Sequence, residues 1–360
     1  MVAAPPCIVH GTPELDCLDF SGKTVYNDFR DDLVRDGFCV VKNVLPKEKA
    51  AYYVQEIHQW LEDFGLGYDR NDPSTIREEC LPVIHQKGLI QAYGAPHESF
   101  TWSVRSEPDV IDVFAKIFGT EDLLTSFDAV NVSLPRKDLA PNKPWAHQDQ
   151  DPDRPGFRCV QGFVNLLPNG PQDGGLVVLK QGHIASKEYH KVMNDKDEVF
   201  RWTNEMYVFQ EKGMEWLKEH GYEWVKVDCE AGDLVLWDSR TPHYNVSPSA
   251  GNPRMVVYTC YAPVSTASEE DLLRKKQAFE ELHGHSHWPQ GVTASKRDIA
   301  LTAKLTKFSC SGLQPFIKEF VGPKRNGEPD PLNTWKPRKP PVLSERAFKL
   351  TGIPYIKSSA

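Results

Sequence analysis

The chain has 360 residues, of which 40% are hydrophobic and 26% charged, an ordinary composition for a globular protein with a sizeable core. Its net charge of −8 offers no electrostatic basis for binding nucleic acid or an anionic membrane, and no apolar run approaches the roughly 20 residues of a spanning helix. The first residues lack the basic and apolar regions of a secretory signal, and the eight cysteines are scattered without paired spacing. We therefore expect a cytoplasmic protein with reduced thiols.

The N-terminal part predicts an irregular arm followed by helices around one strand. Residues 1–22 are punctuated by Pro and Gly, and a helix over about 25–35 should lead into a strand over 39–42. Apolar residues at helical spacing predict a second helix near 46–64. Pro108 suits the first turn of a third helix over 108–118.

Short strand-like runs dominate the middle of the chain. They cover 123–134, 157–167, 176–180, 224–227, 234–237 and 254–261. Gly, Pro and Asn turns separate them, and the helices lie mostly outside the run. This order predicts a mainly β fold with flanking helices, built on a jelly roll, that is, a cupin-like double-stranded β-helix.

The tripeptide His147-Gln148-Asp149 is a candidate metal-binding motif. In an extended segment side chains alternate, so His147 and Asp149 should point the same way. Alone, the tripeptide also fits a polar surface loop. A second segment, 232–245, predicts a Gly-Asp turn, a short buried strand, a polar connection and then His243. Two His and one carboxylate suit a non-heme Fe(II) oxygenase, because they leave metal positions open for substrate and O₂.

Arg254 opens the apolar strand predicted over 254–261. A buried guanidinium needs a partner, and its fork of donors matches a carboxylate. In a ferrous oxygenase that partner would be the distal carboxylate of 2-oxoglutarate. An internal Asp or Glu is the alternative.

Several segments together resemble the phytanoyl-CoA dioxygenase family of Fe(II)/2-oxoglutarate oxygenases. The His-x-Asp motif, the distal His and the Arg eleven residues after it have that family's arrangement. Segment 36–45 is similar to its Asp-Gly-Phe strand entry, 173–183 to its Gly-Gly-Leu strand and turn, and 232–245 to its Gly-Asp…His-x-Asn segment. The resemblance runs in order from about 32 to 263.

The resemblance implies roles for individual residues. His147, Asp149 and His243 match the iron ligands, and Arg254 matches the anchor of the co-substrate's distal carboxylate. Gln161 corresponds roughly to a residue that lines the co-substrate site. Related halogenating enzymes replace the carboxylate ligand with a small residue, so Asp149 favours hydroxylation or desaturation.

We expect an oxygenase domain over 23–263, with a charged and aromatic helical insertion at about 186–221. The insertion could form a lid over the barrel mouth or a decoration on its outside. Residues 264–360 should form a helix and an extended tail packed on the same domain. Within them, His283, His285 and His287 alternate, but Gly284 and Pro289 favour a loop over a second metal site.

The sequence thus predicts an Fe(II)- and 2-oxoglutarate-dependent dioxygenase that uses O₂ to oxidise a small or medium organic metabolite, with release of succinate and CO₂. Neither nucleic acid nor membrane is expected as a partner. Two alternatives stay open: a cupin-like metalloenzyme that does not use 2-oxoglutarate, and a non-catalytic binding module on the same scaffold. The sequence indicates neither the substrate's identity nor the oligomeric state.

Overall fold

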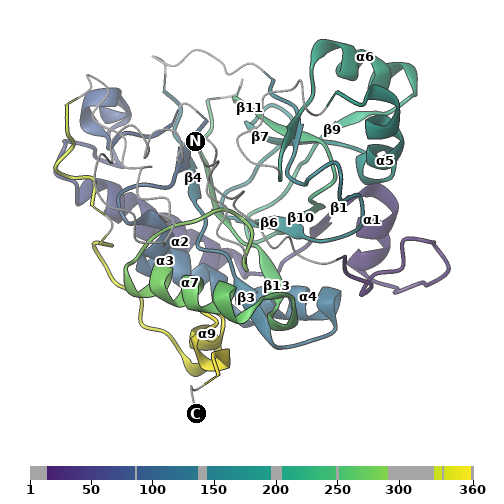
Figure 1. The fold of residues 1–360 in the computed structure, drawn as a ribbon. Coiled ribbons are helices and arrows are strands. Elements are labelled where there is room, and N and C mark those ends of the chain that lie inside the picture. The colour runs from purple at the N-terminus through teal and green to yellow at the C-terminus, as the bar shows by residue number, and fades with distance from the viewer. Residues whose placement is uncertain are drawn as a thin grey trace, which may run out of the picture.

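The computed structural model describes residues 14–85, 87–136, 144–195, 205–248, 251–290, 328–334 and 336–357. Two antiparallel β-sheets lie together, and most helices lie around the larger one (Figure 1). This confirms the predicted jelly roll with flanking helices.

The larger sheet forms the base of the fold. Its main path runs β1 (Phe38–Val41), β10 (Leu234–Asp238), β6 (Val160–Asn165), β12 (Arg254–Tyr258), β4 (Val130–Ser133) and β2 (Leu89–Ile90). Off this path, β13 (Tyr261–Pro263) pairs with β6 and with β3 (Leu123–Thr125). All these pairs are antiparallel.

The smaller sheet carries the residues of the predicted metal motif. Its order is β8 (Tyr207–Val208), β5 (His147–Gln148), β11 (His243–Val246), β7 (Gly175–Leu179) and β9 (Trp224–Lys226). In the register of β5 and β11, His147 is the direct partner of His243. A hydrogen-bonded sheet therefore joins two segments that are far apart in the sequence.

Both faces of the larger sheet are covered. One face packs with the helices in the main hydrophobic cluster, through Val130, Val132, Val164, Leu236, Met255 and Val257. The alternate residues Phe163, Val235, Trp237 and Val256 pack instead with Leu176 and Val178 of the smaller sheet. Because both faces are covered, every residue of the central strands β6 and β10 is buried, including the polar Gln161 and Asn165 of β6.

The described helices are α1 (Phe29–Asp36), α2 (Lys47–Glu62), α3 (Ser99–Arg105), α4 (Pro108–Phe118), α5 (Gly182–Met193), α6 (Glu211–Glu219), α7 (Glu269–Glu280) and α9 (Glu345–Lys349). α2, α3 and α4 contribute most helical residues to the main cluster. Pro108 does stand in the first turn of α4, as predicted, and a capping box of Ser268 and Asp271 opens α7. No helix of the described residues is long and apolar enough to cross a membrane.

Three predicted elements have wrong boundaries. The first helix begins at Phe29 rather than near 25, because Asp28 caps it and Asp31 accepts hydrogen bonds from the backbone of Tyr26 and Asn27. The strand predicted over 254–261 is two strands, since the Thr259 amide bonds to Gly162 and the chain then moves to pair with β3. The run 123–134 is likewise divided, into β3 and β4.

The described part of the insertion builds a small aromatic core of its own. Tyr189 of α5, Trp216 of α6, and Tyr207 and Phe209 around β8 cluster beside the smaller sheet. α5 and α6 accordingly stand near β7 and β9 in Figure 1. Part of the predicted insertion, 196–204, lies outside the described residues.

The described C-terminal segments contact the helical side of the fold. The Glu98 carboxylate accepts hydrogen bonds from the backbone of Arg338 and Lys339. Further on, the Leu350 carbonyl accepts from the Thr125 amide at 3.0 Å. The domain division expected from the sequence stays a prediction.

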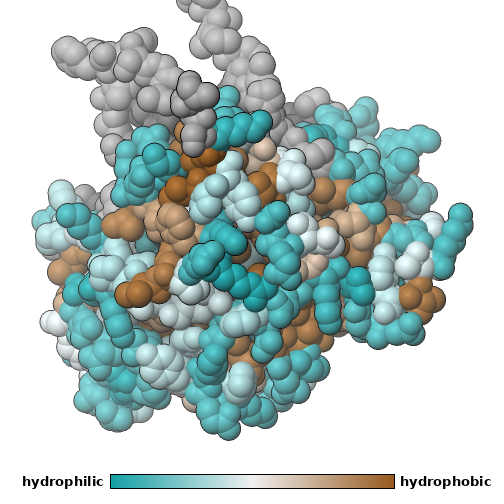
Figure 2. Space-filling view, turned by 90° about the horizontal axis from the view of Figure 1, so that it is seen from below, coloured by the Kyte–Doolittle hydropathy of each residue, from teal (hydrophilic) through white to brown (hydrophobic). Residues whose placement is uncertain are grey.

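The face seen from below in Figure 2 mixes hydrophilic and hydrophobic residues. The large apolar side chains exposed in the described part are spread over four helices and two loops, with two of them, Ile184 and Val192, on α5; the others are Val25, Tyr52, Leu273, Val342 and Phe348. Single exposed apolar residues of this kind are ordinary on protein surfaces.

Candidate metal centre

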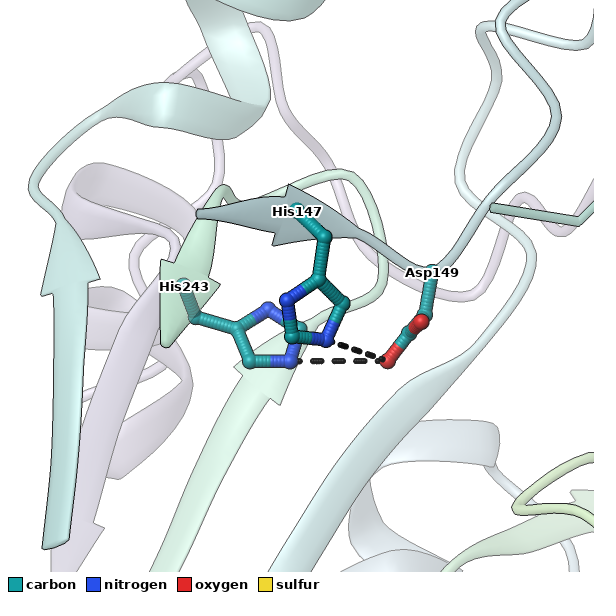
Figure 3. A group of neighbouring side chains, drawn as sticks. All are labelled: His147, Asp149 and His243. Atoms are coloured by element: carbon teal, nitrogen blue, oxygen red, sulfur yellow. Dashed lines mark ion pairs between the residues drawn. The ribbon is translucent and has the colours of Figure 1, made fainter. Parts of the chain in front are cut away.

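His147, Asp149 and His243 converge at one point of the smaller sheet (Figure 3). One potential ligand atom from each lies within 4.8 Å of the others. The Oδ2 atom of Asp149 is 3.4 Å from Nε2 of His243 and 3.7 Å from Nε2 of His147. The part of the chain that the structure describes contains no other such group of three His, Cys, Asp or Glu residues.

Strand pairing and a loop contact place the three side chains. His147 and His243 face each other across β5 and β11, with ring centroids 4.4 Å apart. Asp149 lies just beyond the end of β5, where its amide donates to the carbonyl of Ser239 at 3.1 Å. The predicted convergence of His147 and Asp149 is therefore present, although the strand itself is only two residues long.

Both histidines have the tautomer that a metal requires. Nδ1 of His147 donates to the Trp145 carbonyl at 2.9 Å, and Nδ1 of His243 donates to the Thr241 carbonyl at 3.0 Å. A carbonyl oxygen can only accept, so the proton of each neutral ring is on Nδ1. The Nε2 lone pairs are left facing Asp149, as in metal sites whose ligand histidines are oriented by a backbone carbonyl.

The electrostatics favour a neutral His147 beside an ionised Asp149. Burial lowers the pKa of His147 to about 4. Burial also opposes ionisation of Asp149, but the neighbouring rings of His147, His243 and His287 bring the pKa of that carboxyl below its usual range. Near neutral pH the site therefore offers the Nε2 lone pair of His147 and an anionic oxygen of Asp149.

Gln161 lies next to the carboxylate of the group. It is 5% exposed, and its Nε2 donates to Oδ2 of Asp149 at 2.9 Å. Its Oε1 is buried and has no hydrogen-bond partner among the described residues. The direct partner of Gln161 in β10 is Trp237, whose ring is 5.3 Å from that of His243 and whose Nε1 is also buried and unpartnered there.

Arg254 is buried at the start of β12, with its guanidinium carbon 4.9 Å from the ring centre of Phe163. Its Nη2 is buried without a hydrogen-bond partner, and no acidic side chain in the described ranges forms an ion pair with it. The phenol of Tyr258, whose pKa is raised by burial, faces both Arg254 and Asn131. The internal Asp or Glu considered as an alternative partner is thus absent from the described residues.

Other buried histidines lie outside this group, and most of them have structural contacts. His183 is buried, and its Nε2 bonds to the Val34 carbonyl at 3.0 Å. The His283 carbonyl bonds to His97, and the His285 ring accepts from the Phe127 amide. His287 does not join a second metal group within the described ranges; its Nε2 is buried and unpartnered there.

Sequence reasoning missed two features of this centre. The contact between Gln161 and Asp149 depends on the path of the loop after β5, which no local pattern reveals. Tyr258, by contrast, could have been found, because it follows Arg254 by four residues and strand alternation puts both on one face.

The chain is similar to several known proteins. The family model for phytanoyl-CoA dioxygenase (PhyH) matches residues 33–254. "Ava biosynthesis cluster protein O" of Aspergillus versicolor is 38% identical, over 76% of this chain and 89% of that protein. A "Putative phytanoyl-CoA dioxygenase" of Dictyostelium discoideum is 24% identical, over 69% of this chain and 78% of that protein.

Solved structures with a similar fold include EctD from S. alaskensis with 2-oxoglutarate and 5-hydroxyectoine. It has a TM-score of 0.46 and 18% identity, over 71% of this chain and 84% of that one.

A jelly roll that brings two histidines and an aspartate together at one sheet is the architecture of a non-heme iron oxygenase. The family match spans well over half of the chain and includes all three residues. The chain belongs to the phytanoyl-CoA dioxygenase (PhyH) family of Fe(II)/2-oxoglutarate-dependent oxygenases.

Proposed function

We propose that the protein is an Fe(II)- and 2-oxoglutarate-dependent dioxygenase that oxidises, by hydroxylation in the first instance, a small or medium organic metabolite. The observation that carries the proposal is the convergence of two Nε2 atoms on Oδ2 of Asp149, at 3.7 Å for His147 and 3.4 Å for His243. His147, Asp149 and His243 are its proposed iron ligands. Their donor set fits the group, because neutral imidazoles and a carboxylate on one side of the metal leave the other side open.

Arg254 is the proposed anchor for the distal carboxylate of 2-oxoglutarate. Its buried, unpartnered Nη2 fits this role, because leaving a guanidinium donor without an acceptor in a buried place is costly. Phe163 beside the guanidinium limits access of water. A planar fork of donors also matches a carboxylate better than a single ammonium does.

With O₂, iron and 2-oxoglutarate supply an oxidant that removes a hydrogen atom from a C–H bond, and succinate and CO₂ are released. The chain's own residues hold and orient the proposed metal ligands and limit the access of water to them. The backbone carbonyls of Trp145 and Thr241 fix the two imidazole rings, and Gln161 holds the carboxylate. The buried rings of Phe163 and Trp237 limit the access of bulk water to this region. Since Asp149 occupies the carboxylate position, halogenation is disfavoured.

The proposed substrate is a free metabolite rather than a macromolecule. The relative from Aspergillus versicolor is named as a protein of a biosynthesis cluster, which supports a biosynthetic intermediate as the class of substrate. The net charge of −8 gives no reason to expect a polyanionic partner.

Anaerobic titration of the metal-free protein with Fe(II), and then with 2-oxoglutarate, tests the proposal. We expect a weak visible charge-transfer band in the wild-type protein that requires both components. In Arg254→Ala the band should need much more 2-oxoglutarate, while Fe(II) alone binds as before. Iron binding with no band would indicate a cupin-like metalloenzyme, and no iron binding would exclude the oxygenase.

A further inference from the structure

The two ends of the Gln161 amide have different surroundings. Nε2 contacts the proposed metal ligand Asp149, whereas Oε1 is buried without a hydrogen-bond partner among the described residues. Resting on the function proposed above, we propose that Gln161 is a positioning residue with two roles. Its Nε2 holds the metal-facing oxygen of Asp149, and its Oε1 accepts a hydrogen bond from a donor bound beside the metal. That donor is a water molecule until a substrate O–H or N–H group replaces it.

The donor end is fixed by the chemistry of its neighbour. Oδ2 of Asp149 is the oxygen that faces both His147 and His243, and it is also the atom to which Nε2 of Gln161 donates at 2.9 Å. An ionised carboxylate can only accept hydrogen bonds, so the nitrogen of the amide must be the atom on this side. The bond therefore restricts rotation of the carboxylate about the position where the metal is held.

The position of Nε2 determines where Oε1, the acceptor end of the same amide, must lie. With Nε2 turned to Asp149, Oε1 points away from it, and it is buried without a partner among the described residues. The direct partner of Gln161 in β10 does not satisfy it, because the indole N–H of Trp237 also has no hydrogen-bond partner among the described residues. A buried acceptor left empty costs free energy, so a bound donor would stabilise the site.

Because Oε1 of Gln161 is an acceptor, its partner must be a hydrogen-bond donor, and this requirement excludes the co-substrate. 2-Oxoglutarate near neutral pH has two carboxylates and a keto group, all of which only accept hydrogen bonds. It cannot satisfy Oε1 of Gln161. The family resemblance placed Gln161 at the co-substrate site. We instead assign its Nε2 to the metal ligand Asp149 and its Oε1 to water or substrate.

The location of Gln161 in the sheet makes it a rigid support. It is the second residue of β6, a strand that pairs with β10 on one side and, at the adjacent Val160, with β13 on the other. Strand residues hold a functional group more accurately than loop residues do, which matters because Asp149 itself lies in a loop. The hydrogen bond from Gln161 thus connects Asp149, which follows β5 of the smaller sheet, to a strand of the larger sheet and limits its movement.

Fe(II) affinity tests the donor end without any substrate. We expect Gln161→Met, which is close in volume but has no amide, to weaken Fe(II) binding about 10- to 100-fold in an anaerobic competition with a coloured Fe(II) chelator. Gln161→Asn keeps an amide but is one methylene shorter, so it should show a loss in the same direction. Gln59→Met, at an exposed position of α2, is the control and should bind Fe(II) like the wild type.

A structural effect is separated by measuring thermal unfolding of the metal-free variants. If Gln161→Met does not fold, the Gln161→Asn variant decides. Unchanged Fe(II) affinity in a folded variant overturns the proposal for the donor end, even if the charge-transfer band with 2-oxoglutarate forms normally. Conversely, a loss of Fe(II) affinity in a protein that forms no such band supports this role of Gln161 while the oxygenase function fails.

A crystal structure of the complex with Mn(II) and 2-oxoglutarate tests the acceptor end. We expect an ordered water at hydrogen-bonding distance from Oε1 of Gln161, with the co-substrate's oxygens elsewhere. A carboxylate or keto oxygen of 2-oxoglutarate against the amide, with Nε2 turned away from Asp149, would overturn the proposal.

Discussion

Arg158 and Glu205 form a two-pronged buried ion pair, with Nη1–Oε2 and Nη2–Oε1 distances of 2.7 and 2.6 Å. The side chains are 2% and 7% exposed. Oε2 of Glu205 also accepts from the amide of Asp151, two residues beyond the candidate ligand Asp149. One ion pair therefore joins the start of β6, the ligand loop and the segment leading into β8.

Glu205→Ala should lower the free energy of unfolding by about 3–5 kcal/mol, because it leaves a buried guanidinium without its carboxylate. Denaturant unfolding of the metal-free protein measures the effect. The double variant Arg158→Met/Glu205→Leu removes both charges and should recover most of the loss. Equal instability of the single and double variants would show that packing, not charge, dominates at this position.

Asp149→Asn should bind Fe(II) at least about 100-fold more weakly, because a neutral amide replaces the only anionic ligand of the candidate centre. An anaerobic Fe(II) titration measures the affinity. His220→Ala is a suitable control, since this histidine bonds to the Trp216 carbonyl at the end of α6. Wild-type affinity in Asp149→Asn would contradict the assignment of the ligand.

Arg254→Lys should not preserve the affinity of the proposed co-substrate site for 2-oxoglutarate. A lysine keeps the positive charge but loses the planar fork of donors, so we expect 2-oxoglutarate to bind about 30-fold more weakly or worse. The measurement is the 2-oxoglutarate concentration that half-saturates the charge-transfer band. A lysine variant that matches the wild type would mean that charge alone holds the co-substrate.

Gly232 stands where the Gly-Asp turn enters β10. Its φ is +92°, and a Cβ added there would meet the carbonyl oxygen of Leu45 at 2.1 Å. Gly65 also has a positive φ, +67°, but a Cβ there has nothing within 4 Å. We expect Gly65→Ala to cost about 1–2 kcal/mol of stability and Gly232→Ala about 1–3 kcal/mol more, measured by denaturant unfolding. Equal costs would show that the contact with Leu45 relaxes freely.

Stability should fall on acidification partly through His97. Burial lowers the pKa of this fully buried histidine from 6.5 to about 3, while its Nε2 bonds to the His283 carbonyl. Between these two values the unfolded chain binds more protons than the folded one. The contribution of His97 is therefore fully present above pH 6.5 and is lost as the pH falls towards 3, by at most about 1.4 kcal/mol per pH unit.

Denaturant unfolding of the metal-free protein at several pH values tests this prediction. His97→Gln keeps a donor and an acceptor but does not titrate, so its stability should change less steeply between pH 6.5 and 4. An unchanged slope would assign the acid sensitivity to other groups.

The sequence predicted the ligand set because its signals are local and ordered. His147 and Asp149 lie two residues apart, and Arg254 follows His243 by eleven residues. The role of Gln161 could not be predicted in the same way, because its neighbour Asp149 lies on a loop beside the other sheet. The family resemblance suggested a position near the co-substrate, and only the path of that loop places its amide on the carboxylate.

The elements of the fold were predicted better than their ends. A short polar segment precedes the first helix. Asp28 accepts from the Arg30 amide inside the helix, and Asp31 accepts from the amides of Tyr26 and Asn27 before it, which apolar spacing does not reveal. The division between β12 and β13 is set by pairing with distant strands rather than by a turn residue between them. Tertiary contacts decide such boundaries, which is why periodicity alone missed them.

The pairing of His147 with His243 across β5 and β11 makes iron loading a measure of correct folding. A slip of one residue between these strands would turn one imidazole to the opposite face of the sheet, and no metal could then bridge the two. Molecules trapped in a shifted register would stay metal-free however much Fe(II) is supplied. The ratio of bound iron to protein would thus report the fraction of chains that have folded correctly, even while the substrate is unknown.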